Sequence, residues 1–255
     1  MSLSEKIRVF LRLHAVQFLW NFKGMQNVGF YYAILPALRR IYAGDSQGLE
    51  QAQRRHFGFF NTHPYFAPIC VGVSIKLEED LRAGKGKPEM IPVLKNRMSG
   101  PLAAVGDAFF WETVRPTVGA LAALSVYALG LSSASTIRLL LLLWILYVLP
   151  VEWLRWQGLS WGYLHGFDVV KVLKERGFQK RMKRLRTLGM FLLGGVTVGF
   201  VMLYDDRIFL WCCRAGIAGL LVLLTLRKVS PTFQLYILIL VALLVSYLGT
   251  MAGLV

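Results

Sequence analysis

Acidic residues are scarce in this sequence: 14 Asp and Glu stand against 29 Lys and Arg in 255 residues, a formal net charge of +15. Such an excess suits nucleic acid, anionic lipid or an acidic protein, because each attracts cations through the same long-range electrostatics. Charged residues of both signs make up only 17% of the chain, while 56% are hydrophobic. So apolar a composition argues against a soluble globular domain and indicates a membrane protein, whose cytoplasmic flank is typically basic.

Side chains suited to catalysis or metal binding are also few. The three cysteines include adjacent Cys212 and Cys213, which cannot form an unstrained disulfide, so we interpret all three as apolar residues. The four histidines do not pair at metal-ligand spacing. The sequence has no phosphate-binding loop and no H-E-x-x-H, C-x-x-C or G-x-S-x-G motif. We therefore expect no metal, no cofactor and no catalytic residue.

Long uncharged stretches fill the second half of the chain, each near the roughly 20 residues that span a bilayer as a helix. Three are uninterrupted: 116–137, 187–204 and 229–255. Residues 139–151 make a fourth and 208–226, interrupted by Arg214, a fifth. The sequence thus predicts an all-α, multi-pass membrane protein with about five transmembrane helices, in a region covering residues 113–255.

The orientation of these spans follows from Lys and Arg in the loops between them. Residues 168–186 contain eight basic side chains, whereas the next turn is only Asp205, Asp206 and Arg207. Because positive loops stay on the cytoplasmic side, the 168–186 loop is expected to be cytoplasmic and the C-terminus external. This basic loop is also a candidate dock for an acidic cytosolic partner.

The first hundred residues have a different pattern. Apolar residues recur at helical spacing opposite Lys and Arg over residues 1–23, which predicts an amphipathic helix at the membrane interface. Residues 24–38 and 56–75 are uncharged but short or interrupted by prolines, and we expect re-entrant hairpins there. Residues 76–97 carry ten charges and read as a solvated cytoplasmic connector. Residues 24–112 therefore form the predicted core segments.

Polar side chains inside these apolar segments are the candidate functional residues. Amides and carboxylates can hydrogen-bond vicinal hydroxyls while aromatic rings cover the apolar face of a sugar, so the inventory suits a carbohydrate. The candidates are Asn21, Gln26, Asn61, Asp107, Trp20 and Trp111. Two alternatives stay open: Asn61 caps a broken helix, or Asp107 pairs with Arg115. Arg115 and Glu112 are expected to have structural or partner-binding roles.

Several short strings resemble, in order, the D component (enzyme IID) of the mannose-family phosphotransferase system. The strongest are Phe59-Phe60-Asn61-Thr62 and, forty residues later, Gly100-Pro101-Leu102-Ala103 with Gly106-Asp107. Others are Trp20-Asn21, Met25-Gln26, Arg55-His56, Phe110-Trp111, Arg115-Pro116 and Arg227-Lys228-Val229. The resemblance covers nearly the whole chain, about residues 5–254, as a single family domain.

The resemblance implies a subunit of a bacterial sugar permease in the inner membrane. Such a D subunit forms the sugar translocation path with a C subunit of related, inverted architecture, and the C–D pairs trimerise. Phosphate comes from separate cytosolic A and B components, so this chain would transport without catalysing phosphoryl transfer. The alternative is a regulatory or assembly scaffold that does not transport.

Three departures from the family pattern bear on these expectations. Lys23 and Gly24 follow Asn21-Phe22 where the family usually has glutamate and arginine, so mannose specificity is not carried over. Only Asp205-Asp206-Arg207 occupies the place of a long external insert, and Glu112 replaces a usually small residue.

Overall fold

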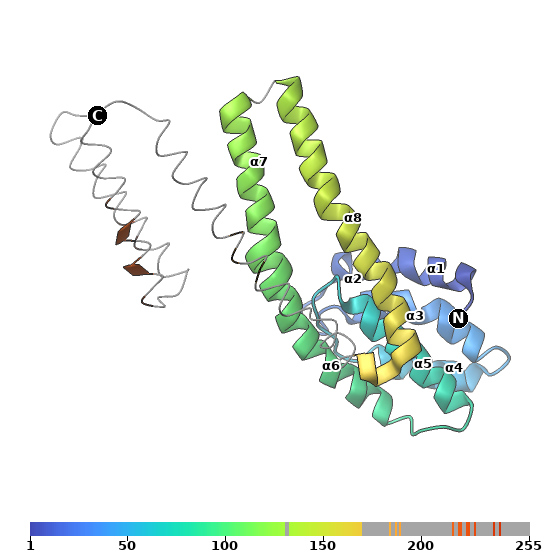
Figure 1. Ribbon diagram of the computed structural model, residues 1–255. Helices are drawn as coiled ribbons and strands as arrows, with labels where there is room; N and C mark the ends of the chain where they lie inside the picture. The colour runs from blue at the N-terminus through green and yellow to red at the C-terminus, as the bar shows by residue number, and fades with distance from the viewer. Residues whose placement is uncertain are drawn as a thin grey trace. The chain divides into compact units, whose positions relative to one another are not determined.

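A computed structural model describes residues 1–130 and 133–169, with isolated positions at 184, 187, 189, 216, 219–220, 223–224, 227, 237 and 240. The chain divides into two compact units, Met1–Gly194 and Gly195–Val255. The first unit contains all the elements described below, and they are helical (Figure 1). The basic loop 168–186 lies outside the described residues beyond residue 169, and so, apart from the isolated positions, do the spans predicted over 187–204, 208–226 and 229–255.

The N-terminal segment forms two short helices, α1 (Leu3–Leu13) and α2 (Ala15–Phe18), rather than one helix over residues 1–23. The side chain of Ser2 accepts a hydrogen bond from the Glu5 amide and caps α1. Val9, Leu13 and Val16 are buried in the core that these helices share with α3. Other apolar side chains remain exposed, namely Leu3, Ile7, Leu11, Phe18 and Phe22. The segment therefore has a second apolar face, and its place at a membrane interface stays a prediction.

The predicted hairpin over 24–38 does not turn back within itself. It is mostly one helix, α3 (Asn27–Ile41), which continues through Pro36 even though the proline removes one backbone hydrogen bond and crowds the preceding turn. The reversal comes later, and Asp45 then caps α4 (Ser46–His56) by accepting from the Gly48 amide at 2.8 Å.

The second predicted hairpin, over 56–75, is also absent as such. Residues 57–66 are irregular, and α5 (Ala67–Arg82) follows without a return path. Pro68 lies in the first turn of α5, where the missing N–H would have no helical partner in any case. Pro64 and Pro68 thus lie just before and at the start of one helix, and they do not separate two half-helices.

The predicted solvated connector over 76–97 is largely helical. Only residues 83–89 separate α5 from α6 (Met90–Gly106). Glu78 is 0% and Lys95 1% exposed, so two of the ten charges lie in the protein interior. The prediction was wrong there because both side chains have neighbours from distant helices, which local composition does not reveal.

The helix α6 continues through a π-helical segment, η1 (Asp107–Val114), into α7 (Arg115–Leu129), and Figure 1 shows the three as one long run. Pro116 in the first turn of α7 cannot donate to the preceding turn and crowds it, and the wider π-turn relieves that crowding. The span predicted over 116–137 is wrong at its end: α7 stops at Leu129, and Gly130 takes a positive φ of 79°.

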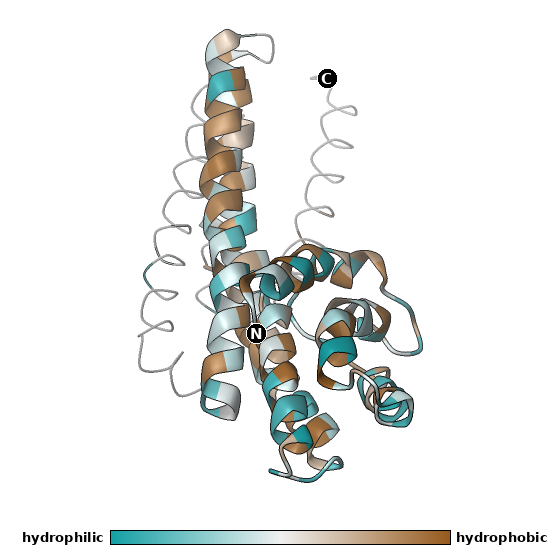
Figure 2. Cartoon of the chain, turned by 90° about the vertical axis from the view of Figure 1, so that its right-hand side faces the viewer, coloured by the Kyte–Doolittle hydropathy of each residue, from teal (hydrophilic) through white to brown (hydrophobic). Residues whose placement is uncertain are grey.

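The helix α8 (Ala134–His165, 32 residues) follows and packs beside α7. Within the described part of the chain, it is the one helix whose length and hydropathy suffice to cross a bilayer. It contains the predicted span 139–151, and its apolar stretch stands out in Figure 2. A short 3-10 turn, η2 (Gly166–Asp168), ends this part of the chain.

Helices α5 and α8 approach so closely that their backbones touch. A Cβ at Gly162 would lie 2.2 Å from the Ile69 carbonyl oxygen, and one at Gly72 would lie 2.3 Å from the Leu159 carbonyl oxygen. Glycine on both helices is the small-residue packing that lets helices approach in lipid. This contact fixes the start of α5, and hence residues 57–66, against α8.

Candidate functional site

Two segments that carry predicted site residues lie side by side. Residues 21–26 form a tight turn in which the Asn21 and Met25 backbones exchange hydrogen bonds at 2.9 Å. The Gln26 amide donates to the Phe60 carbonyl at 2.8 Å, and the Phe60 amide donates to the Gly24 carbonyl at 3.3 Å. The structure thus brings the Asn21 turn against the segment that contains Asn61.

The side chain of Asn21 is occupied within its own turn. Its Oδ1 accepts from the Gly24 amide, and its Nδ2 donates to the Met25 carbonyl and to Asn27 Oδ1. A Cβ at Gly24 would lie 2.2 Å from Asn27 Nδ2, so a larger residue there would require the Asn27 side chain to move. Asn21 therefore shapes the turn.

Gln26 is 3% exposed and is also bonded at both ends of its amide. Its Oε1 accepts from the Thr62 amide at 3.0 Å, and its Nε2 donates to Gln17 Oε1 at 3.1 Å. The Thr62 hydroxyl donates to the Ser99 carbonyl at 2.9 Å. Gln26 and Thr62 thereby hold residues 60–62 between the Asn21 turn and α6.

Asn61 differs from these neighbours. It is half-buried, and among residues 1–130 and 133–169 its side chain has no hydrogen-bond partner. The capping alternative is not supported, since α5 begins six residues later with Phe66 at its N-cap and no side-chain cap. Hydrogen bonds of the Phe60 and Thr62 backbones hold the chain on both sides of Asn61, whose side-chain amide has no partner among the described residues.

The next residue but one, His63, packs into the aromatic residues of η1. Its ring stacks on Phe110 at 5.1 Å between centroids and meets Trp111 edge to face at 5.2 Å. A Cβ at Gly106 would lie 2.3 Å from the His63 Cβ, so glycine permits this contact. Trp111 is 44% exposed and is therefore available to a ligand on its outer side.

The remaining candidates are placed less closely. Asp107 begins η1 directly after Gly106, and it is half-buried. Between these two described residues, Asp107 and Arg115 form no ion pair, because eight residues of one helix separate them. Arg115 and Glu112 are exposed. Trp20 is 38% exposed, and its ring packs on Phe22 at 4.8 Å.

Sequence reasoning missed a buried ionic cluster around Glu78. Its carboxylate accepts from His56 at 2.7 Å, from Tyr42 at 2.6 Å and from two nitrogens of Arg55 at 3.1 and 2.8 Å. Burial alone would raise the pKa of Glu78, but the hydrogen bonds from His56 and Arg55 outweigh it and lower the pKa to about 2. Burial and the Glu78 charge raise the pKa of Tyr42 to about 12.

Lys95 lies beside this cluster and has no carboxylate partner among the described residues. Its Nζ is 3.5 Å from the His56 carbonyl oxygen and 5.0 Å from the Phe30 ring centroid. Burial lowers the pKa of Lys95 to about 8. Arg55-His56 belonged to the family-like strings, which was the available signal, but Lys95 had none.

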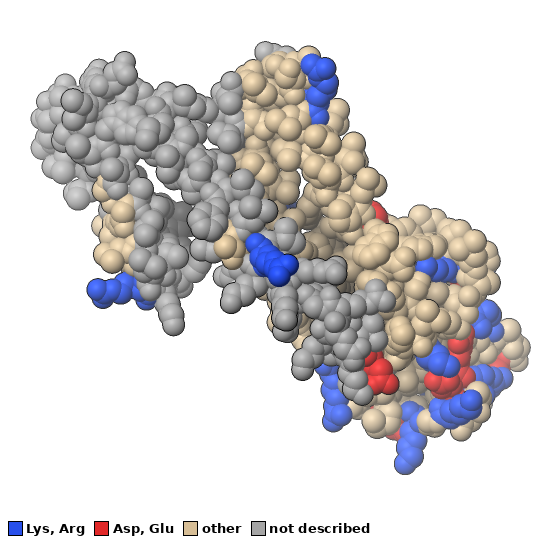
Figure 3. All heavy atoms as spheres, viewed as in Figure 1, with Lys and Arg blue, Asp and Glu red and all other residues tan. Residues whose placement is uncertain are grey.

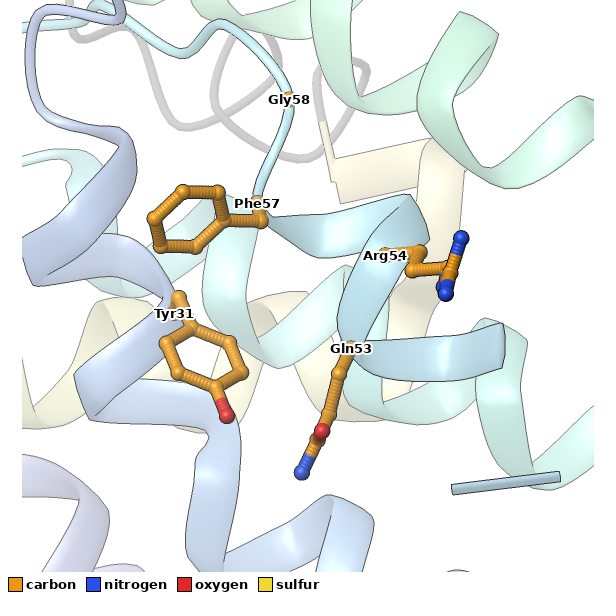
Figure 4. Close-up of a pocket in the computed structure, with 5 residues that line it drawn as sticks. All are labelled: Tyr31, Gln53, Arg54, Phe57 and Gly58. Atoms are coloured by element: carbon orange, nitrogen blue, oxygen red, sulfur yellow. The ribbon is translucent and has the colours of Figure 1, made fainter. Parts of the chain in front are cut away.

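Two surface features do not include Asn61. An open groove of about 540 Å³ is lined by Tyr31, Gln53, Arg54, Phe57 and Gly58, with the Tyr31 and Phe57 rings edge to face (Figure 4). None of the predicted site residues lines it. In Figure 3 most of the visible Lys, Arg, Asp and Glu side chains of the first unit lie at the end away from the tip of α8. Basic atoms also lie at that tip, and the α8 face between the two ends is nearly free of charge.

The sequence has clear relatives. Residues 2–251 match the family described as "PTS system mannose/fructose/sorbose family IID component". The chain belongs to this family. The mannose-specific EIID component of Escherichia coli K12 is 38% identical over 189 residues, which are 74% of this chain and 65% of that protein. The match thus spans just under two thirds of that relative's length. The fructose permease IID component of Bacillus subtilis is 32% identical over 193 residues, 75% of this chain and 68% of that protein.

Solved structures share the fold of this family member. A chain of "Structure of membrane protein" aligns with a TM-score of 0.77 and 30% identity, covering 99% of this chain and 97% of that one. A chain of the cryo-EM structure of the mannose transporter ManYZ in complex with microcin E492 aligns with a TM-score of 0.60 and 29% identity, covering 100% and 98%. The all-helical, mannose-type IID fold is therefore confirmed.

Proposed function

We propose that this IID family member is the membrane-embedded D subunit of a phosphotransferase sugar permease and forms the translocation path with a C subunit. Family membership along residues 2–251 supports this proposal. The likeness to a chain of the mannose transporter ManYZ supports pairing with a second membrane subunit. The two relatives described act on mannose and fructose by name, so the substrate class we propose is a hexose.

The observation that carries the proposal is the state of Asn61. Its neighbours Phe60 and Thr62 are bonded to the Asn21 turn and to α6, yet its own amide has no partner among the described residues. A half-buried amide can donate to one sugar hydroxyl and accept from another. We assign Asn61 and Asp107 to the hydroxyls and Trp111 to the apolar face of the ring. Asn21 and Gln26 keep the segment in place.

The chemistry of phosphorylation is assigned to other proteins. Separate cytosolic A and B components supply the phosphoryl group, and the B component docks on the cytoplasmic side, to which we assign loop 168–186. The C-terminus is external, the membrane is the bacterial inner membrane, and three C–D pairs form the working assembly. Residues 1–23 lie along the membrane interface with the exposed side chains Leu11 and Phe18 toward lipid.

The experiment is sugar uptake coupled to phosphorylation in vesicles that contain this chain and its C subunit, supplied with the A and B components. The proposal expects uptake that disappears when this chain is omitted, and a strong loss with Asp107→Asn. Unchanged uptake with Asp107→Asn removes Asp107 from the site.

A non-transporting scaffold is the alternative, favoured by Lys23 and the short turn 205–207. The same vesicles separate the two. A scaffold would support assembly of the C subunit, but the vesicles would take up none of mannose, fructose and sorbose. That result would overturn the transport proposal.

A further inference from the structure

We infer that Tyr147 and Arg155 of α8 are positioning residues for the sugar site, and that they act on Asn61 through Tyr65. The inference rests on the proposed function, because it takes Asn61 as a sugar contact. Tyr65 follows Asn61 by four residues in the irregular segment 57–66, so the two share one short stretch of chain.

Tyr65 is held by two side chains of the long apolar helix. Its hydroxyl lies 2.8 Å from the Tyr147 hydroxyl, so the two share a hydrogen bond. The Arg155 guanidinium carbon lies 4.9 Å from the centroid of the Tyr65 ring, a cation–π contact. Tyr147 and Arg155 are about two turns apart on α8. Tyr147 contacts the hydroxyl of Tyr65, and Arg155 contacts its ring.

Arg155 has few other partners. It is 9% exposed, its Nε has no hydrogen-bond partner among the described residues, and its Nη1 is 3.6 Å from Glu152. Arg155 lies four residues beyond the predicted span 139–151, and a buried cation with so few hydrogen bonds is costly unless other neighbours stabilise it. The Tyr65 ring is therefore a principal neighbour of this buried charge.

The contacts continue from Tyr65 through His63 to the aromatic residues of η1. The Tyr65 amide donates to His63 Nδ1 at 3.3 Å, and the two rings meet edge to face at 4.8 Å. The His63 ring in turn contacts Phe110 and Trp111. Displacing Tyr65 would thus change the relation between Asn61 and Trp111 without removing a residue that touches sugar.

Tyr147→Phe tests this inference, because it removes one hydroxyl and leaves the ring. The matched control is Tyr163→Phe on the same helix, which removes a hydroxyl that donates to Glu79 at 2.8 Å, away from the segment 57–66. In the purified C–D complex we expect Tyr147→Phe to raise the sugar Kd about fivefold, the effect of one neutral hydrogen bond. Tyr163→Phe should leave the Kd unchanged.

Hydrogen exchange at the amides of residues 61–63, 65 and 66 is the second readout and does not depend on sugar. Tyr147→Phe should speed this exchange and Tyr163→Phe should not. The double variant Tyr65→Phe/Tyr147→Phe should match Tyr147→Phe alone, because both remove the same bond. Equal sugar affinity for Tyr147→Phe and wild type, or an equal shift for Tyr163→Phe, would overturn the inference. Wild-type complex that binds no sugar refutes the proposed function instead, and faster exchange would still report the positioning.

Discussion

His56 donates from Nε2 to the carboxylate of Glu78 at 2.7 Å, and both side chains are fully buried. This bond joins α4 to α5, and the other donors are Tyr42, directly after α3, and Arg55 of α4. The irregular segment 57–66 begins directly after His56, so the ionic cluster anchors one end of the candidate site. The other end is anchored by α5 against α8.

Replacing Glu78 should destabilise the protein strongly. Glu78→Gln leaves the largely buried Arg55 without its carboxylate partner, and we expect a loss of about 3 kcal/mol in the free energy of unfolding. Thermal unfolding of the detergent-solubilised protein measures it. The control is Glu50→Gln, whose exposed i,i+4 pair with Arg54 should contribute less than about 0.5 kcal/mol. Equal effects of the two variants would contradict the account of the cluster.

The Glu78 cluster also predicts an acid dependence. The pKa of Glu78 is lowered to about 2 in the folded protein from an ordinary value of 4.5. The contribution of Glu78 to stability is therefore present above pH 4.5 and is lost as the pH falls toward 2. Unfolding midpoints of wild type should fall over this range more steeply than those of Glu78→Gln, and parallel curves would count against the assignment.

Lys95 predicts a change of stability with pH in the same direction, but in the alkaline range. Its pKa is lowered to about 8 from 10.5, so the unfolded chain binds the proton more tightly than the folded protein. Stability should rise as the pH increases from 8 to 10.5, by about 3 kcal/mol from this residue. Lys95→Met should remove this dependence and raise stability at pH 7. Chemical unfolding at pH 7, 8.5 and 10 checks it, and a variant less stable than wild type at pH 7 would refute it.

The backbone contact between α5 and α8 predicts a steric effect. Gly162→Ala places a methyl group 2.2 Å from the Ile69 carbonyl oxygen and should cost about 2 kcal/mol. Gly100→Ala in α6 is the control, since a Cβ there has open space and alanine favours a helix. Unfolding midpoints should fall for the first variant and hold or rise for the second. Similar midpoints would show that the helices can separate without loss.

The described apolar helices were partly predictable from the sequence. The run 139–151 lies within α8 because hydropathy along a helix is a local property. The end of α7 was misplaced because the turn at Gly130 carries no charge, so an uncharged run of 22 residues reads through it.

The burial of charged residues was harder to predict from the sequence. Glu78 and Lys95 stand among many charged neighbours in sequence, which predicts solvent, and their burial depends on Arg55, His56 and Phe30 from other helices. The candidate site was found in part: Asn61 was named for its polarity in an apolar segment. Gln26 was named too, but its bonds to Thr62 and Gln17 depend on folding.

The most direct test of the account is equilibrium sugar binding to the purified C–D complex with Asn61→Ala. We predict at least a tenfold rise in Kd, about 1.4 kcal/mol, since a half-buried amide that bonds sugar hydroxyls is lost. The matched control is Asn96→Ala, an exposed asparagine on α6, which should bind as wild type does. Wild-type affinity in Asn61→Ala, with Asn96→Ala also unchanged, would contradict the claim that Asn61 contacts the sugar.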